Sequence, residues 1–298
     1  MKEMKEQFSK ETKTPDPSSR NPTPDELPLV SVVIATKNEE AHIENCLRSI
    51  KDQSYPQDHM EIVVVDNASN DRTKEIALAY TERVFDKGPE RSAQRNFGAE
   101  QCRGEYFIYL DADMVLSEEL VGNCVDLVRG KPEVIALYIP EIVTGDVFFS
   151  RVRRFERSFY DGTVIDCARF IRRKIFLELG GFDLNLTGPE DWDLDKRLRK
   201  RGHIDLVQAP LYHNEADFDL GKYLSKKEYY SDDFGAYMNK WGKDDPDVQK
   251  QFGIWYRFFG VFLERGKWKK ILAHPILALG MYFLRVLVGW RFLRKRLS

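Results

Sequence analysis

The sequence has few cysteines, and none lies close to another. Its four cysteines are Cys46, Cys102, Cys124 and Cys167, and no two of them form a CxxC pair. Disulfide-rich secreted domains and structural zinc sites both depend on closely spaced or numerous cysteines. The spacing therefore argues against both, and we expect a protein of a reducing compartment.

The N-terminal segment, residues 1–28, lacks any apolar run. It contains five prolines and many charged residues, so it cannot bury enough apolar surface to fold by itself. We expect a disordered arm there and no secretory signal. The chain also lacks the series of long apolar runs that a polytopic membrane protein needs, which disfavours a synthase with a membrane channel.

Acidic residues are missing from the C-terminal end. From Arg265 onward the chain has nine basic residues and no acidic one, whereas the rest has 37 basic against 48 acidic residues, a formal charge of −11. The net charge of −2 for the whole chain hides this division. An acidic body with a basic, apolar tail favours contact with an anionic membrane surface over binding of nucleic acid.

The chain does contain the material for one large α/β domain, with 298 residues and 42% hydrophobic residues. Continuous β-branched runs at 29–35, 61–66 and 106–110 predict buried strands, and a short strand is expected at 83–85. Helical patterns at 40–53, 71–80 and 88–104 alternate with them. This alternation predicts a parallel sheet with helices on both faces.

The second half of the chain has a less regular pattern. Strands are expected at 134–140, 168–173 and 203–208, and helices at 148–160, 220–241 and 247–262. Ligands of parallel sheets bind at the carboxyl ends of the strands, so the residues that follow each strand are candidates for a site.

Polar clusters follow three of the predicted strands. They are Thr36 to Glu39, Asp66 to Asp71, and Asp111-Ala112-Asp113. Asp, Asn and Ser also shape turns and cap helices, so each cluster alone is compatible with turn chemistry. Two carboxylates directly after a buried strand, however, suit a hard cation such as Mg²⁺ or Mn²⁺ that shares substrate phosphates.

Four segments together resemble the motifs of family 2 glycosyltransferases, in the order of that family. They are LVSVVIATKNEE, EIVVVDNASNDRT, RSAQRNFGAEQCRGEYFIYLDADM and GGFDLNLTGPEDWDLDKRLRKRG, and the resemblance covers about residues 29–213. The resemblance implies the GT-A fold, a Rossmann-like, mostly parallel sheet flanked by helices. It also implies inverting transfer of a sugar from a nucleotide diphosphate sugar donor.

The resemblance assigns the donor nucleotide to residues at the strand ends and the following helix: Thr36, Glu39, Asp66, Arg91, Arg95 and Asp111. Asp66 would accept a hydrogen bond from the base, and Asp111 would lie beside the ribose. Arg91 or Arg95 would lie near the diphosphate, and the sequence does not decide which.

The resemblance also implies a divalent metal ion. Asp113 would be the direct ligand of Mg²⁺ or Mn²⁺, and His213 matches the late metal-binding histidine of the family. The alternative for His213 is a loop histidine without a ligand role.

A second acidic pair, Glu190-Asp191, opens a helical pattern after a Gly-Pro turn. Acidic residues in a first helical turn also complement the helix dipole. The resemblance makes Asp191 the general base that takes the proton of the acceptor, with Glu190 and Gly181 on the acceptor side. Arg197 could bind phosphate or pair with Asp193 one turn earlier.

The predicted organisation has four parts: the arm at 1–28, a GT-A domain at 29–215, a helical extension at 216–266 and a basic amphipathic segment at 267–298. Two arginines, Arg285 and Arg291, lie within the apolar stretch of the last part. Charges inside a spanning helix are costly, so we expect this segment to lie at the inner face of the cell membrane. A soluble helix packed on the core, or an oligomer contact, is the alternative.

These features predict a metal-dependent, inverting glycosyltransferase that acts on a lipid-linked or cell-envelope glycan acceptor. One alternative is a polyprenyl-phosphate sugar transferase, whose acceptor pocket should be basic and open to the bilayer. Another is a catalytically silent protein that binds nucleotide sugars as a scaffold. A nucleotidyltransferase is disfavoured, because the sequence ATKNEE after the first strand is not a glycine-rich phosphate loop.

Overall fold

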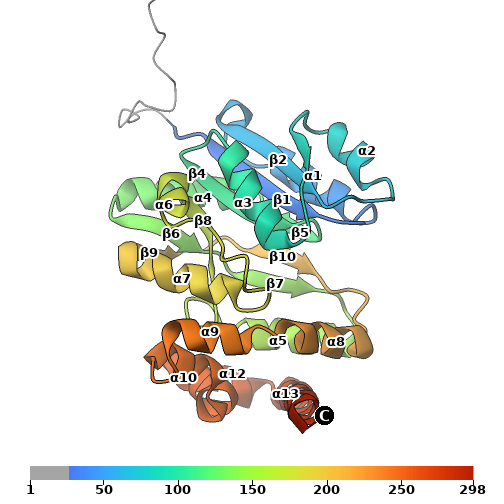
Figure 1. Cartoon of the computed structure of the whole chain (residues 1–298), viewed down its shortest axis with the longest axis vertical. Helices are drawn as coiled ribbons and strands as arrows, with labels where there is room; N and C mark the ends of the chain where they lie inside the picture. The colour runs from blue at the N-terminus through green and yellow to red at the C-terminus, as the bar shows by residue number, and fades with distance from the viewer. Residues whose placement is uncertain (1–26, 298) are drawn as a thin grey trace, which may run out of the picture.

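The computed structural model describes residues 27–297. The predicted arm at 1–28 therefore lies almost entirely outside the described residues. Three layers follow one another in Figure 1: a large sheet with its helices, a small sheet, and a group of C-terminal helices furthest from the large sheet.

The large sheet has seven strands in the order β3-β2-β1-β4-β8-β6-β9. Its first four members are parallel, as the sequence predicts. They are β1 (Val30–Thr36), β2 (Met60–Asp66), β3 (Val84–Asp86) and β4 (Tyr106–Asp111). β6 (Val134–Tyr138) and β9 (His203–Leu206) pair in parallel with each other. Between them and β4 lies β8 (Ala168–Arg172), which is antiparallel to both neighbours.

Helices cover both faces of this sheet because successive side chains of its strands point to opposite sides. Val32 and Ile34 of β1 pack in one apolar core with α1 (Ile43–Lys51), α2 (Thr73–Leu78) and α4 (Leu120–Gly130), while Val33 packs in the other. The second core contains α3 (Arg91–Gln101), α6 (Arg173–Glu178) and α7 (Glu190–Arg201). Burial on both faces explains the unbroken apolar runs of the strands.

A small sheet, which the sequence pattern does not predict, lies next to the carboxyl end of β4. It consists of β5 (Met114–Leu116), β10 (Leu211–Asn214) and β7 (Glu141–Thr144), in that order. These strands have three or four residues each, too few for a clear alternation of apolar and polar side chains. The sheet carries His213 on a strand rather than in a loop.

The C-terminal helices form the third layer, with a core of their own. That core joins α5 (Phe148–Arg157), η3 (Tyr256–Gly260), α11 (Val261–Leu263) and α13 (Pro275–Leu297). α8 (Leu220–Tyr230), α9 (Phe234–Trp241), α10 (Pro246–Phe252) and α12 (Trp268–Ala273) complete the layer.

Two long helices expected in this region are each divided. The pattern at 220–241 gives α8 and α9, because residues 231–233 form a turn in which Ser231 and Asp232 bond back to carbonyls of α8. The pattern at 247–262 is interrupted after Phe252 by Gly253. α13 packs on α5, which belongs to the predicted catalytic domain. The predicted boundary between that domain and a separate tail stays a prediction.

Close packing requires a glycine at the entry to β4. A Cβ on Gly104 would lie 2.5 Å from Ser31 Oγ and within 2.8 Å of the backbone oxygens of Tyr106 and Leu29. We therefore expect Gly104→Ala to lower the free energy of unfolding by about 1–3 kcal/mol in urea titrations, because overpacked cores must shift. Gly130→Ala is the control, since no atom lies within 4 Å of its added Cβ. Equal losses for the two variants would contradict this explanation.

Candidate active site

The loops after β1 and β2 are held together by hydrogen bonds from one loop to the other. The Asn38 N–H donates to Ser69 Oγ (2.8 Å), the Asn70 N–H donates to Asn38 Oδ1 (2.9 Å), and the Glu39 N–H donates to Thr73 Oγ1 (2.7 Å). Asn38 has a left-handed backbone with φ 54°, which Asn tolerates better than most residues. Turn chemistry therefore accounts for much of these two polar clusters.

The residues expected around the base and ribose differ in their burial and in their hydrogen bonds. Thr36 is buried, and its Oγ1 has no hydrogen-bond partner among the described residues. Burial, together with the nearby Asp113, raises the pKa of Glu39. Asp66 is fully buried, and both of its carboxylate oxygens accept hydrogen bonds from Ser69. Contact between Asp66 and a base thus stays a prediction, and it requires this turn to rearrange.

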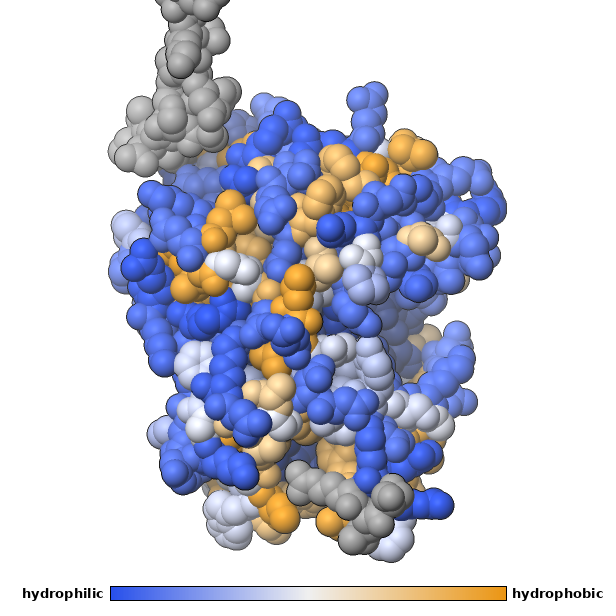
Figure 2. Space-filling view, viewed as in Figure 1, coloured by the Kyte–Doolittle hydropathy of each residue, from blue (hydrophilic) through white to orange (hydrophobic). Residues whose placement is uncertain are grey.

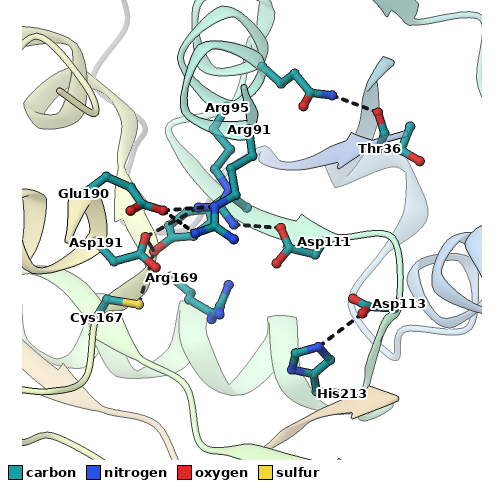
Figure 3. A network of polar contacts seen from close by, with 12 residues as sticks. Thr36, Arg91, Arg95, Asp111, Asp113, Cys167, Arg169, Glu190, Asp191 and His213 are labelled. Atoms are coloured by element: carbon teal, nitrogen blue, oxygen red, sulfur yellow. Dashed lines mark hydrogen bonds and ion pairs between the residues drawn. The ribbon is translucent and has the colours of Figure 1, made fainter. Parts of the chain in front are cut away.

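Arg95 joins two acidic residues that lie far apart in the sequence, Asp111 and Asp191. Its side chain is only 1% exposed, and its guanidinium lies 2.7 Å from Asp111 Oδ1 and 3.4 Å from Asp191 Oδ1. The ring of Tyr109 lies beneath it, 4.7 Å away. Burial alone would raise the pKa of Asp111, but Arg95 and Arg91 hold that pKa well below its usual range. Figure 3 shows both arginines between the pair Glu190-Asp191 and Asp111.

Arg91 lies one helical turn before Arg95 and holds the loop that leads to Asp191. Its guanidinium is 2.8 Å from Glu190 Oε1, donates to Tyr230 Oη at 2.7 Å, and donates to the Thr187 carbonyl at 3.3 Å. Burial and the adjacent Asp191 raise the pKa of Glu190 to about 7. Both arginines thus face the acidic edge, and each forms an ion pair with at least one carboxylate there.

Asp113 and His213 form a second pair, across the edge from Arg95. His213 Nε2 lies 3.2 Å from Asp113 Oδ2, and His213 Nδ1 lies 2.9 Å from Glu141 Oε1. Burial alone would lower the pKa of His213, but Asp113 and Glu141 raise it to about 10. The side chain is therefore held in one orientation by carboxylates on both ring nitrogens (Figure 3).

These residues fit a hard divalent ion that takes further ligands from its substrate. No group of three or more His, Cys, Asp or Glu side chains is arranged to hold a metal within residues 27–297. Asp113 Oδ1, however, is buried without a hydrogen-bond partner there, next to the imidazole of His213. A histidine whose second nitrogen is bound by a carboxylate is a common support for a metal ligand. Mg²⁺ in particular uses few protein carboxylates together with substrate phosphates.

Two charged residues of this region escape the sequence analysis. Glu141 on β7 accepts from Arg157 (3.0 Å) and from Arg169 of β8 (3.2 Å), in addition to its contact with His213. Arg169 is buried and stacks over Tyr109 at 5.3 Å, on the side of the site near Asp111. Each is a charged residue at the start of, or within, an apolar strand. Burying such a charge is costly unless it is paired, and this could have marked both residues in the sequence.

The double glycine before α7 ends a helix and also borders a surface pocket. Gly180 and Gly181 have φ of 78° and 70° and end α6, as a helix C-cap does. Gly181 also lines a surface pocket of about 430 Å³ together with Asp183 and Lys240. Arg197 bonds Asp193 and the carbonyls of this turn, so it stabilises the turn itself and is not directed toward the site of Asp113.

The fold and the clustered acidic residues at the strand ends define an α/β protein of the nucleotide-sugar-binding type. Comparisons with known proteins agree with this class. The profile described as Glycosyl transferase family 2 matches residues 31–183, about half of the chain. The chain belongs to this family of glycosyltransferases.

Individual relatives share less of their length with the chain. Glycosyltransferase AglE of Haloferax volcanii is 36% identical over 122 residues, which cover 36% of this chain and 40% of AglE. The poly(ribitol-phosphate) β-N-acetylglucosaminyltransferase TarS of Staphylococcus aureus is 32% identical over 102 residues, 31% of this chain and 18% of TarS. The matches thus span less than half of either relative.

Solved structures support the fold over most of the chain. Mannosyltransferase PcManGT from Pyrobaculum calidifontis, in complex with GDP-Man and Mn²⁺, superposes with a TM-score of 0.58 over 93% of this chain and 87% of its own, at 20% identity. The expected GT-A fold, with its mostly parallel sheet and helical C-terminal segment, is confirmed.

Proposed function

We propose that the protein is a metal-dependent, inverting glycosyltransferase that moves a sugar from a nucleotide diphosphate sugar to a lipid-linked or cell-envelope glycan acceptor. The observation that carries this proposal is that Arg95 bridges Asp111, at the end of β4, and Asp191, at the start of α7, while the nearby Asp113 pairs with His213. PcManGT, which shares the fold, is described with a nucleotide sugar and Mn²⁺. TarS is named for transfer to poly(ribitol-phosphate), a polymer that contains phosphate.

The reaction assigns one role to each side of this edge. The acceptor oxygen forms a bond to the anomeric carbon as the bond from that carbon to the diphosphate oxygen breaks. The nucleoside diphosphate leaves with the electron pair, and Asp191 takes the proton of the acceptor. Arg95 and Arg91, which bind carboxylates in the described structure, would hold the diphosphate with charge-assisted hydrogen bonds.

A divalent ion held by Asp113 and His213 would supply positive charge at the leaving diphosphate. Thr36 and Glu39 would contribute from the carboxyl end of β1, where the buried Thr36 Oγ1 has no hydrogen-bond partner within residues 27–297. Gly181 and Glu190 lie on the side of α7, where the acceptor would approach. These roles are proposed for the residues that match the motifs of the family.

We further propose that the protein binds the anionic inner surface of the cell membrane through α13. Among the described residues, α13 is the one helix long and apolar enough to cross a membrane. One side of it packs on the protein through Ala278, Met281 and Leu284, and Arg285 forms an ion pair with Glu156 of α5 at 2.9 Å. A helix held in this way cannot span a bilayer, so we infer that it lies along the surface.

The opposite side of α13 carries an exposed apolar ridge. The ridge consists of six side chains, each 51–72% exposed and spaced three or four residues apart: Ile276, Leu279, Phe283, Val286, Trp290 and Leu293. In Figure 2, orange apolar surface is scattered over the whole face of the molecule in view, including its lower end. With the basic C-terminal end beside it, the ridge has the composition of a helix that inserts into an anionic lipid surface.

The ridge can be tested with point substitutions that leave the packed side of α13 intact. We expect Leu279→Glu with Val286→Glu to lower the affinity for anionic vesicles at least about tenfold, since burying each apolar side chain contributes about 1.5–3 kcal/mol. Vesicle flotation measures this affinity. Leu78→Glu, at an exposed position on α2 at the far end of the molecule, is the control. Full retention of binding by the double variant would exclude the ridge as the membrane contact.

The proposed activity is tested with a panel of nucleotide sugars and Mn²⁺ or Mg²⁺, scored for slow hydrolysis of the donor. This measurement needs no knowledge of the acceptor. We expect turnover with one or a few donors and none after removal of metal by EDTA. Binding of a donor without any turnover would instead support the silent scaffold.

A further inference from the structure

Four cationic side chains meet beneath α13, outside the residues assigned to the donor. This basic cluster consists of Arg153 on α5, Lys227 on α8, Arg257 on η3 and Arg285 on α13. Its carboxylates are Glu156 and Glu215. When Lys227 is protonated, the cluster has four positive and two negative charges, an excess of two positive charges in a largely buried place.

Two of the four cations are paired. Arg285 lies 2.9 Å from Glu156 Oε1, and Arg153 lies 2.7 Å from Glu156 Oε2 and 3.3 Å from Glu215. Tyr160 also donates to Glu156 at 2.7 Å. Both oxygens of each carboxylate thus already accept from these partners, and neither carboxylate accepts from Lys227 or Arg257.

Lys227 and Arg257 have no such partner. No hydrogen bond or ion pair joins either side chain to an acceptor within residues 27–297, and Arg257 Nη1 is among the buried donors left without a partner. Lys227 lies only against the ring of Tyr223, 5.6 Å away. Burial and the neighbouring Arg153 lower the pKa of Lys227 to about 7. Unpaired buried charge is costly, so this arrangement suits an anion that binds from outside.

The position of the cluster connects the membrane side of the protein with its active site. Arg285 extends from the packed side of α13, opposite the apolar ridge. Lys227 lies three residues before Tyr230, whose hydroxyl accepts a hydrogen bond from Arg91. Both Lys227 and Arg257 are partly exposed, which leaves a route of access.

We propose that the basic cluster binds the phosphate group of the acceptor lipid, whose chains lie beside the apolar ridge. A phosphate monoester carries about −1.5 to −2 charges at neutral pH, which balances the excess of the cluster. Guanidinium and ammonium groups are the usual protein partners of phosphate. This inference rests on the proposed function for its choice of lipid acceptor, and it adds the class of that lipid, one with a phosphate at the membrane surface.

The test compares two kinds of vesicle with equal surface charge, one containing phosphatidic acid and the other phosphatidylserine. We expect the full-length protein to prefer phosphatidic acid, and Lys227→Gln to reduce that preference about tenfold, the usual cost of one charged hydrogen bond. Lys222→Gln is the matched control, because it removes the same charge from an exposed position on the same helix. Lys227→Arg should restore the preference.

Equal binding to both vesicles, or equal losses in Lys227→Gln and Lys222→Gln, would overturn the proposal and leave only general charge attraction. Stabilisation by inorganic phosphate that depends on Lys227, without any preference between the vesicles, would show a site for free phosphate and overturn the lipid source. Arg257→Gln is a second variant for the case that Lys227→Gln unfolds, and thermal unfolding of each variant identifies that case.

Donor hydrolysis by the wild-type protein separates this inference from the proposed function. A preference for phosphatidic acid that depends on Lys227, without hydrolysis of any donor, would remove the proposed function and keep the phosphate site. Hydrolysis without that preference would remove the phosphate site alone.

Discussion

Replacing Asp191 with Asn is expected to reduce turnover by about 10²-fold or more while donor affinity stays nearly unchanged. Asp191 is in the first turn of α7, with Oδ1 at 3.4 Å from Arg95 and 3.5 Å from Tyr109 Oη. Asn has the same shape but cannot take a proton, and general base catalysis contributes about 10² to 10⁴ in rate. Steady-state kinetics with the preferred donor measure turnover, and calorimetry measures donor affinity.

Glu190→Gln is the matched control, because it makes the same chemical change at the neighbouring carboxylate. Glu190 is fully buried and paired with Arg91, so we expect its replacement to affect the loop more than the proton transfer. If Asp191→Asn turns over at a near-normal rate and Glu190→Gln does not, then Glu190 is the base.

Asp113→Ala is expected to abolish metal-dependent binding of the nucleotide with little loss of stability. The Asp113 side chain is partly exposed, and its carboxylate is hydrogen-bonded to His213 alone among the described residues. Removing it therefore leaves no buried cation without a carboxylate, since Glu141 still binds His213. Calorimetry of the nucleoside diphosphate with Mn²⁺, and again with EDTA, measures the metal-dependent part of the affinity.

Asp86→Ala controls for the loss of an acidic residue at the same edge of the sheet. Asp86 ends β3 and forms an exposed ion pair with Lys74 at 2.7 Å, an interaction that contributes little to stability. The control should keep its response to EDTA. An unchanged metal-dependent affinity in Asp113→Ala would place the metal ligand elsewhere.

The strand ends illustrate how far the sequence can be interpreted. The runs that became β1, β2 and β4 are apolar on both faces, a pattern with few competing structures, and their parallel arrangement was predicted correctly. The direction of β8 was not predictable, because an antiparallel strand buried on both faces has the same composition as a parallel one. The small sheet that carries His213 was missed because its strands are too short for a periodic signal.

The candidate site shows the same division. Asp111, Asp113 and Asp191 could be selected from motifs, since each follows a local pattern of strand or helix start. The sequence could not show whether Arg91 or Arg95 joins Asp111 to Asp191, because both arginines lie on one face of α3, one turn apart. The structure gives that position to Arg95, which is 1% exposed between Asp111 and Asp191.

By itself, the sequence determined the α/β class, the parallel arrangement of the first strands, the acidic residues at their ends and the basic, apolar tail. These features depend on periodicity and composition, which act over a few neighbouring residues. Only the tertiary structure decided that Arg95 pairs with Asp191, 96 residues away along the chain, as well as with Asp111, and that Glu141 supports His213. It also decided that α13 buries one side against α5 and exposes the other. Such contacts depend on which distant elements pack together, and that choice is made by the whole core and not by any single segment.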